Sequence, residues 1–279
     1  MIGLLALLSA GLWGIGDFSG GMGVKAAGGG TGAALRVVLF SHLTSVGVLL
    51  LLGLAGGTPF PHGRLLVWGL VAGLAAGLSL SAFYTALSRG AMGVSAVVSG
   101  VLAAAIPALF SMVVDGAPGW RRGVGFFVAG AAIWLIAKGN GKEGWGTLGL
   151  AVGAGAGFGI YFVALKYAGA GGVVWAMATA RLGSIATCAL ILLGLRAGSG
   201  RVSWRMMRWV VTTAVFDTSG NLLFVAATQA GRLDVAAVLA SLYPASTILL
   251  AALILKEKLT RRQGFGMAVA VVAVVLITV

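Results

Sequence analysis

Residues 31–54 read TGAALRVVLFSHLTSVGVLLLLGL, an apolar run interrupted by Arg36, His42 and a few small polar residues. As a helix rising 1.5 Å per residue, this run is about 36 Å long, which exceeds the roughly 30 Å hydrocarbon core of a bilayer. A helix of a water-soluble protein would keep a polar face, and this run has none. The stretch therefore predicts a membrane-spanning helix.

Nine further runs of this kind fill the chain. Hydrophobic residues make up 59% of the sequence and charged residues 9%, with a mean hydropathy of +1.06, which leaves no room for a soluble domain. Apolar residues without alternation, as in 269–279, exclude a β-barrel, and the first run is expected to be a span rather than a cleaved signal peptide. We predict an all-α polytopic membrane protein with ten transmembrane helices, near residues 2–22, 31–54, 65–88, 93–114, 120–137, 146–167, 172–195, 207–229, 234–255 and 262–279.

The net charge of +13 raises the question of nucleic acid as a partner. The cations lie in loops and at helix ends, as topology determinants and lipid-phosphate anchors do. No basic stripe interleaved with aromatic residues occurs, so we expect membrane lipid and no nucleic acid among the partners. The single cysteine, Cys188, lies within an apolar span and is interpreted as a small packing residue.

The sequence contains an internal repeat. A shift of 141 residues places RRGVG at 121–125 on RQGFG at 262–266, and a shift of 145 places Arg36 on Arg181. The loop between the second and third spans differs in length between the two halves, which explains the change of offset.

Each half, residues 1–139 and residues 140–279, holds five predicted spans. An odd number means that the second half begins on the opposite side of the membrane, so the two repeats are inverted. Inverted repeats are a recurring design of secondary transporters, with the substrate site near the midplane between the halves. The repeat therefore favours alternating access.

Several short motifs point to a known family. They are Leu12-Trp13-Gly14, Arg36 and Arg181, the hairpins Ser88-Arg89-Gly90 and Gln229-Ala230-Gly231, and Lys256-Glu257-Lys258-Leu259-Thr260 followed by Gln263-Gly264. In these motifs the chain resembles the drug/metabolite transporter superfamily, and within it the ten-span EamA-type members. Among these it is most similar to the bacterial YddG-type exporters of aromatic and other neutral amino acids. The resemblance implies a multi-pass protein of the bacterial inner membrane that works as a monomer.

Four charged residues lie inside spans, where a charge costs at least ~2.5–3.5 kcal/mol. Matching depths on neighbouring helices predict two ion pairs, Asp17 with Arg36 and Arg181 with Asp217. Each pair is either a structural lock or a gating or substrate-carboxylate site, and both interpretations stay open. A carboxylate paired with arginine should stay ionised, which weighs against proton coupling through Asp17.

The resemblance implies a central cavity lined from the first, third, fourth, sixth, eighth and ninth spans. Aromatic faces there would contact an apolar side chain, and small polar groups would hydrogen-bond an ammonium or carboxylate. Phe158 is a further candidate for the wall. The predicted substrate-binding residues are Trp13, Ser79, Phe83, Tyr84, Ser99, Tyr161, Asn221, Ser241 and Tyr243.

Three further features carry predictions. His42 is interpreted as a hydrogen-bonded packing residue, with a proton relay as the alternative; Pro107 and Pro244 are candidate bending points or tolerated kinks. Small residues let helix backbones approach closely in lipid. Two glycine ladders with four-residue spacing therefore predict tight packing: Gly69, Gly73 and Gly77, and Gly149, Gly153 and Gly157.

No nucleotide loop, metal-ligand set, catalytic motif or cofactor motif occurs in the sequence, so we expect neither an enzyme nor direct drive by ATP. The leading prediction is a secondary transporter that exports small neutral amphiphilic metabolites, above all neutral amino acids. A multidrug or nucleotide-derivative transporter and a facilitative channel stay open as alternatives. Loop charges favour both termini outside the cytoplasm, whereas the resemblance implies both inside, and we follow the resemblance.

Overall fold

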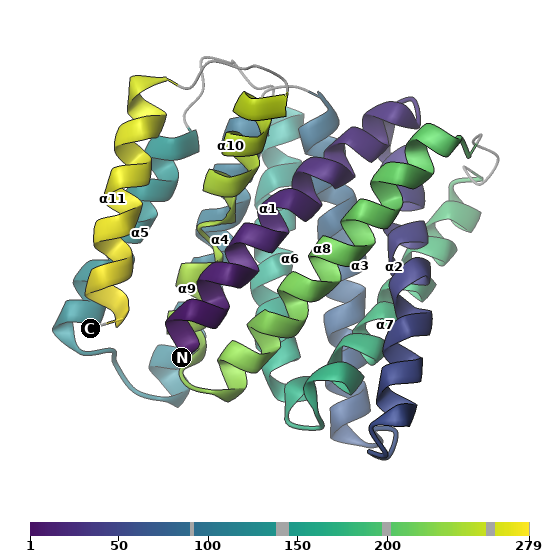
Figure 1. The fold of residues 1–279 in the computed structure, drawn as a ribbon, viewed down its shortest axis with the longest axis horizontal. Helices are drawn as coiled ribbons and strands as arrows, with labels where there is room; N and C mark the ends of the chain where they lie inside the picture. Colours follow the sequence, from purple (N-terminus) through teal and green to yellow (C-terminus); the bar gives the residue numbers. More distant parts are fainter. Residues whose placement is uncertain (90–91, 138–144, 197–201, 255–259, 279) are drawn as a thin grey trace.

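The computed structural model describes the chain except for residues 90–91, 138–144, 197–201, 255–259 and 279 (Figure 1). Each predicted span contains a helix, and the ninth contains two. The largest difference in boundary is at the first span, which ends at Ala26 rather than near residue 22. The helices are α1 (Ile2–Ala26), α2 (Gly30–Ala55), α3 (Arg64–Arg89), α4 (Met92–Val114), α5 (Trp120–Ala137), α6 (Trp145–Gly169), α7 (Val173–Gly194), α8 (Trp204–Gln229), α9 (Leu233–Ala240), α10 (Tyr243–Ile254) and α11 (Arg261–Thr278).

Seven helical segments among the described residues are long and apolar enough to cross a membrane. They are α1, α2, α3, α6, α7, α8 and the α9–α10 segment Leu233–Ile254. A helix satisfies its own backbone hydrogen bonds, which lipid cannot do for it. The predicted spans 93–114, 120–137 and 262–279 contain helices as well, and their crossing of the membrane stays a prediction.

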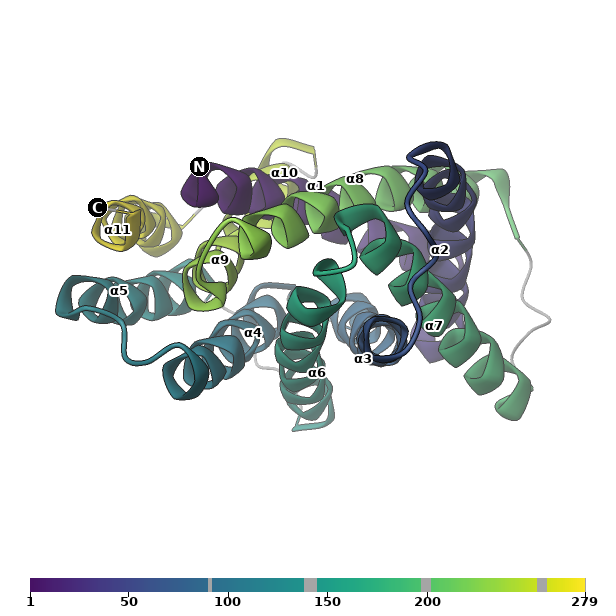
Figure 2. The same ribbon diagram turned by 90° about the horizontal axis from the view of Figure 1, so that it is seen from below.

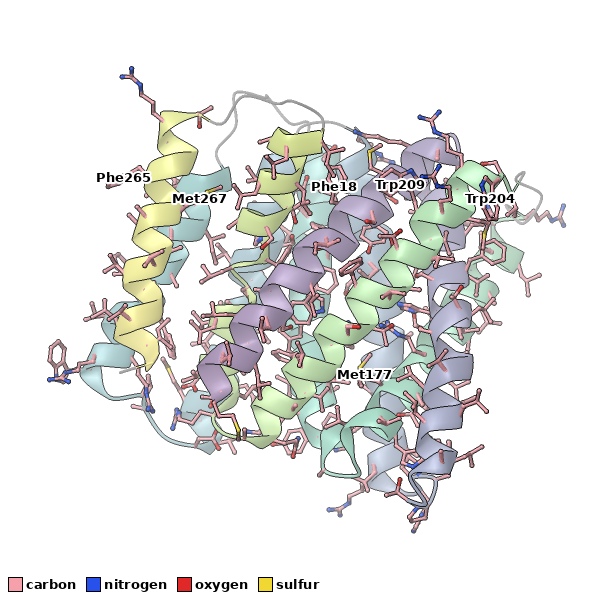
Figure 3. All side chains as sticks on the ribbon, in the orientation of Figure 1. Phe18, Met177, Trp204, Trp209, Phe265 and Met267 are labelled. Atoms are coloured by element: carbon pink, nitrogen blue, oxygen red, sulfur yellow. The ribbon has the colours of Figure 1, made fainter. Side chains whose placement is uncertain are left out.

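The helices form one elongated bundle. Helix α1 lies along α8, and α3 packs between α6 and α7. Seen from below, α5 and α11 pair at one end of the molecule, and α2 with α7 at the other (Figure 2). Both termini lie on the same face of the bundle (Figure 1). Apolar side chains cover its outer surface, and tryptophans such as Trp204 mark the helix ends (Figure 3).

The predicted glycine ladder of α3 is a close helix contact. A Cβ atom on Gly73 would overlap the carbonyl oxygen of Ala180 and the Cα atom of Gly183 on α7. Gly69 and Gly77 face α7 in the same way, against Thr179 and Ser184. The prediction of tight packing is confirmed for this ladder.

The ladder predicted on α6 is only partly correct. Gly149 and Gly153 face open space among the described residues, and only Gly157 packs closely, against Ser79 of α3. The helix packs on α4 through two other glycines, Gly155 and Gly159. Since α6 lies between α3 and α4, its close contacts divide over two faces and do not follow one ladder.

The two prolines differ in effect. Helix α4 continues through Pro107, so the proline is tolerated inside this helix, and a bend there stays a prediction. The ninth span is interrupted after Ala240, and α10 begins at Tyr243 with Pro244 in its first turn. Proline has no N–H to donate to the carbonyl four residues earlier, and it fits the first turn of a helix well.

We expect Gly73→Ala to lower the stability of the folded protein by about 1–3 kcal/mol, because the added methyl group forces two backbones apart. The measurement is thermal unfolding of the purified protein in detergent, followed by tryptophan fluorescence. Gly153→Ala is the matched control, since its methyl group meets open space and alanine favours the helix by about 0.5–1 kcal/mol. Equal melting temperatures of the two variants would contradict the packing described.

Candidate functional site

A narrow cavity lies near the middle of the bundle. Its empty space is about 440 Å³, which includes solvent at its mouth. Seven helices supply its wall, which is mostly apolar with three charged side chains. The lining residues are Trp13, Asp17, Ala76, Leu80, Ala103, Phe158, Tyr161, Phe162, Arg181, Asp217, Asn221 and Tyr243.

Aromatic rings form one side of the cavity. Trp13 of α1 stacks on Phe162 of α6, with ring centroids 5.2 Å apart and planes 1° from parallel. Tyr243 meets the Trp13 ring edge-on at 6.5 Å, and Phe224 packs behind both Trp13 and Phe162. Such aromatic pairs stabilise the orientation of their rings by more than the burial of surface area alone provides. The wall is therefore set by contacts between α1, α6, α8 and α10.

Glycines bring α1 close to its neighbours at this level. A Cβ on Gly14 would overlap α10, and one on Gly16 would press on the backbone of Asp217 in α8. From the other side, Gly220 of α8 makes room for the Trp13 indole. These small residues place Trp13 and Asp17 in the cavity wall.

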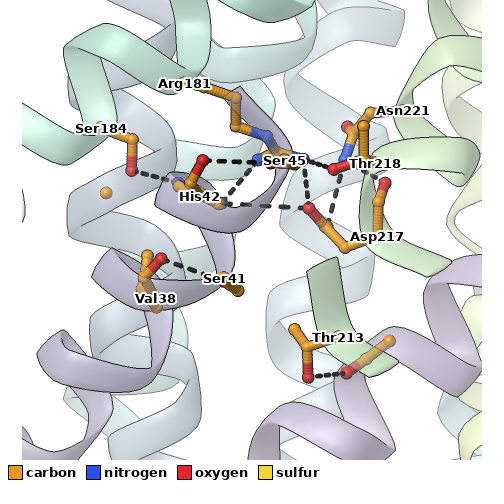
Figure 4. A network of polar contacts seen from close by, with 12 residues as sticks. Val38, Ser41, His42, Ser45, Arg181, Ser184, Thr213, Asp217, Thr218 and Asn221 are labelled. Carbon is orange, nitrogen blue, oxygen red and sulfur yellow. Dashed lines mark hydrogen bonds and ion pairs between the residues drawn. The ribbon is translucent and has the colours of Figure 1, made fainter. Parts of the chain in front are cut away.

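A buried polar network supplies Arg181, Asp217 and Asn221 to the wall (Figure 4). Arg181 of α7, which is 1% exposed, pairs with the Asp217 carboxylate of α8 at 2.5 Å. The same guanidinium donates to Thr218 at 3.0 Å. Asn221 donates to the Asp217 carboxylate and accepts a hydrogen bond from the Tyr161 hydroxyl at 2.6 Å. The Arg181–Asp217 pair predicted from depth is thereby confirmed.

His42 of α2 belongs to this network. Its Nε2 atom lies 2.5 Å from Nη1 of Arg181, and its Nδ1 atom lies 2.8 Å from the Ser184 hydroxyl. A guanidinium can only donate, so Nε2 must accept, and the ring proton sits on Nδ1, where it is shared with Ser184. His42 is thus the hydrogen-bonded residue that the first interpretation predicts, and it joins α2 to α7.

The predicted pair of Asp17 with Arg36 is not among the ion pairs of the described residues. Asp17 lines the cavity, where its electrostatic neighbours are the Asp217 carboxylate and the Tyr84 hydroxyl. Arg36 instead lines a groove on the outside of α2 and α7. Equal depth placed both residues at the same level, but the rotation of each helix decides which neighbour its side chain meets.

Four predicted substrate-binding residues line the cavity: Trp13, Tyr161, Asn221 and Tyr243. Phe158 lines it too. The other five are buried behind the wall. Ser99 contacts the Tyr243 hydroxyl at 3.3 Å and Phe83 packs on Phe158 and Tyr243, while Tyr84 fills the space over Gly20, Ser79 faces Gly157, and Ser241 lies at the break between α9 and α10.

Sequence reasoning missed Phe162 and the small apolar residues of α3 and α4 in the wall. Phe162 follows Phe158 by four residues on the same face of α6, so helical spacing could have identified it. Ala76, Leu80 and Ala103 carry no comparable signal, because alanine and leucine occur throughout every span.

A second polar cluster joins helix ends on the face where the termini lie. Arg232 binds the Asp234 carboxylate at 2.8 Å and donates to the backbone oxygens of Asp115 and Gly116 beyond α4. Lys166 of α6 lies 3.5 Å from the Asp115 carboxylate. We call these residues the terminal-face latch. It fastens the end of α4, in the first half of the chain, to α6 and α9 in the second half.

Comparison with known proteins finds a family match for part of the chain. Residues 145–279 match the EamA-like transporter family. This EamA-like region supplies Tyr161, Arg181, Asp217, Asn221 and Tyr243 of the cavity. The match supports the drug/metabolite transporter superfamily, whose EamA family consists of transporters rather than enzymes, and a multi-pass membrane protein that moves small molecules.

One solved structure, titled only as the crystal structure of a protein, aligns with a TM-score of 0.75 and 15% sequence identity. The alignment covers 100% of this chain and 98% of that chain. At this identity the likeness shows the fold alone, and it extends over both halves. No curated protein matches the chain.

The central network yields a prediction about stability. Asp217→Asn should destabilise the fold by about 3–5 kcal/mol, because it leaves the buried Arg181 charge without its counter-ion. Arg181→Gln combined with Asp217→Asn should recover part of that loss, since no uncompensated charge remains. Unfolding of the two single variants and the double variant in detergent forms a double-mutant cycle. Additive losses would show that the pair is not coupled.

The terminal-face latch yields a prediction about pH. The hydrogen bond from Ser111, aided by Lys166, holds the pKa of the Asp115 carboxyl below its ordinary value of 3.8. A carboxyl with a lowered pKa in the folded state adds stability above pH 3.8 and loses it as the pH falls through the lowered value. Because the pair is partly exposed, the gain is at most about 1 kcal/mol.

Asp115→Asn should therefore melt at a lower temperature than the wild type at pH 6, and the two should converge as the pH falls below 3.8. Thermal unfolding across this range measures the difference. Arg121→Gln, in the exposed helix start nearby, serves as the control and should show no such convergence. A constant difference at every pH would exclude a role for the Asp115 charge.

Proposed function

We propose that this protein is a secondary transporter that exports small neutral amphiphilic metabolites, above all aromatic and other neutral amino acids, by alternating access. One observation carries the proposal: the central cavity combines an aromatic wall with carboxylates and a guanidinium on different helices. We place the protein in the bacterial inner membrane, where it works as a monomer.

The chemistry of the wall fits a zwitterion. An amino acid carries an ammonium and a carboxylate on one carbon, next to its side chain. Asp17 on α1 offers a partner for the ammonium, and Arg181 on α7 offers one for the carboxylate. Trp13, Phe158 and Tyr243 offer flat apolar faces to the side chain. A phosphorylated sugar would need a cluster of cations, and a single guanidinium lines the described cavity.

Helix pairing supports two inverted repeats. The sequence offsets equate α1 with α6, α2 with α7, α3 with α8 and α5 with α11. The contact of α1 with α8 then corresponds to the contact of α6 with α3, and both are extensive. Helices α2 and α5 each pack on their own counterpart. Equivalent helices run in opposite directions through the bundle, as α1 and α6 do (Figure 1). This pattern is typical of a two-fold axis in the membrane plane.

The terminal-face latch supports alternating access. Its contacts join the first half to the second on one side of the cavity, through Arg232, Lys166 and the end of α4. If the halves rock against each other, these contacts must open when this side opens. Arg232, Lys166 and Asp115 are partly exposed, and polar contacts of partly exposed groups exchange with water at small cost, which suits a gate.

The test is counterflow into proteoliposomes loaded with unlabelled tryptophan. Labelled tryptophan, phenylalanine and leucine should accumulate, and a labelled sugar phosphate should not. Accumulation of a lipophilic drug or nucleotide derivative alone would favour the alternative substrate classes. Flux without saturation or counterflow would indicate a channel.

Trp13→Ala should reduce tryptophan and phenylalanine counterflow at least about tenfold, since the ring loses its stacking partner and contact area. Trp204→Ala is the matched control, because Trp204 is 80% exposed at the start of α8. Both variants are first checked for equal expression and melting temperature. Wild-type rates in Trp13→Ala would mean that Trp13 is a packing residue and that the substrate lies elsewhere.

A further inference from the structure

A groove runs along the outside of the bundle between α2 and α7. Its empty space is about 930 Å³, which includes open solvent. Two arginines, Arg36 and Arg196, line it together with apolar side chains. Helices α2 and α7 form one end of the elongated molecule (Figure 2). No residue of the groove lines the central cavity.

On α2 and at the end of α7, each arginine lies closer to the basic face of the bundle than the apolar groove residues of the same helix do. Arg196 follows the end of α7 and is exposed. Arg36 stands six residues into α2, or about 9 Å from the helix start on the same face. A long arginine side chain extends toward the membrane surface while its stem covers apolar neighbours. Both guanidiniums can therefore meet a headgroup above Leu39, Phe40 and Leu193.

The surrounding face of the bundle is basic. The ends of α1, α3, α8 and α11 on this side carry Lys25, Arg89, Arg205, Arg208 and Arg261. In the described part of the chain, the carboxylates at helix ends, Asp115 and Asp234, lie at the terminal-face latch on the opposite face. The positive field on this side concentrates anionic headgroups, at about 1 kcal/mol for each nearby cation.

We propose that the groove between α2 and α7 binds one anionic phospholipid, with its phosphate between Arg36 and Arg196 and an acyl chain along Leu39, Phe40 and Leu193. The planar donors of a guanidinium match phosphate oxygens in pairs. Two guanidiniums beside one phosphate leave an excess positive charge. That excess repels the choline of a zwitterionic lipid and not the glycerol of phosphatidylglycerol.

Such a lipid would brace the helices that carry the polar network. Phe40 and His42 are separated by two positions on α2, and Ala189 of the groove follows Ser184 by five positions on α7. The hydrogen bond between His42 and Ser184 joins the same two helices from within. The bound lipid and the polar network would thus hold α2 against α7 from opposite sides.

Native mass spectrometry of the delipidated full chain tests the proposal. Phosphatidylglycerol should bind in one copy and in preference to phosphatidylcholine. The variant Arg36→Gln/Arg196→Gln should lose about 25-fold in phosphatidylglycerol affinity, since each guanidinium contributes roughly fivefold. Arg205→Gln/Arg208→Gln removes the same charge from the same face outside the groove and should lose much less. Equal losses in the two double variants, or no preference in the wild type, would overturn the site.

A second measurement covers the case in which the arginine variant fails to fold. Leu193→Trp places a fluorophore in the groove, and Val113→Trp places one on the lipid-facing surface of α4, where Val113 is 86% exposed. The chain has eight native tryptophans, so the fluorescence of the added tryptophan is the difference between the variant and the wild type. At 193, phosphatidylglycerol brominated on its acyl chain should quench this difference several-fold more strongly than brominated phosphatidylcholine does. At 113 the two lipids should quench alike. The same response at both positions would refute a specific site.

Discussion

The buried guanidinium of Arg181 is the constraint around which the centre of this protein is organised. A charge that is 1% exposed inside a membrane helix must find its partners within the protein. Helix α8 supplies Asp217 and Thr218, and α2 supplies His42. Each contact requires a particular rotation of its helix, so α2, α7 and α8 are fixed relative to one another. The cavity exists where these polar groups meet the aromatic wall.

Close approach of backbones makes this network possible. In lipid, helices gain little from burying apolar area against each other, so small residues and polar contacts have to hold them together. Gly73 and Gly183 bring α3 onto α7, next to the level of Arg181, and Gly16 brings α1 onto the backbone of Asp217. The glycines thus set the distances, and the charged residues set the rotations. Neither would specify the arrangement alone.

The sequence predicts much of the fold because membrane physics acts on long runs. Helix limits, the α3 ladder and the Arg181–Asp217 pair follow from length, spacing and depth. The depth of a residue in the membrane does not fix the rotation of its helix about the helix axis. Depth alone therefore predicts a pair of Arg36 with Asp17, whereas Arg36 lies in the outer groove. Helix rotation also decides which of the predicted substrate-binding residues line the cavity. Trp13 and Tyr243 reach the cavity, while Ser99 on α4 turns toward the Tyr243 hydroxyl. A residue list cannot encode these angles.

The broken ninth span makes the two sides of the cavity unequal. The offset of 141 equates α9–α10 with α4, which runs unbroken through Pro107. Pro244 cannot donate to the Ala240 carbonyl, and a backbone oxygen without its helical partner is tolerated in a membrane only beside protein polar groups or water. The break directly precedes Tyr243, which lines the cavity. The offset of 141 pairs Tyr243 with Leu102 of α4, whereas the offset of 145 pairs Trp13 with Phe158 of α6, which also lines the cavity. The asymmetry of the wall is therefore confined to the broken span, where α10 supplies an aromatic ring that α4 lacks.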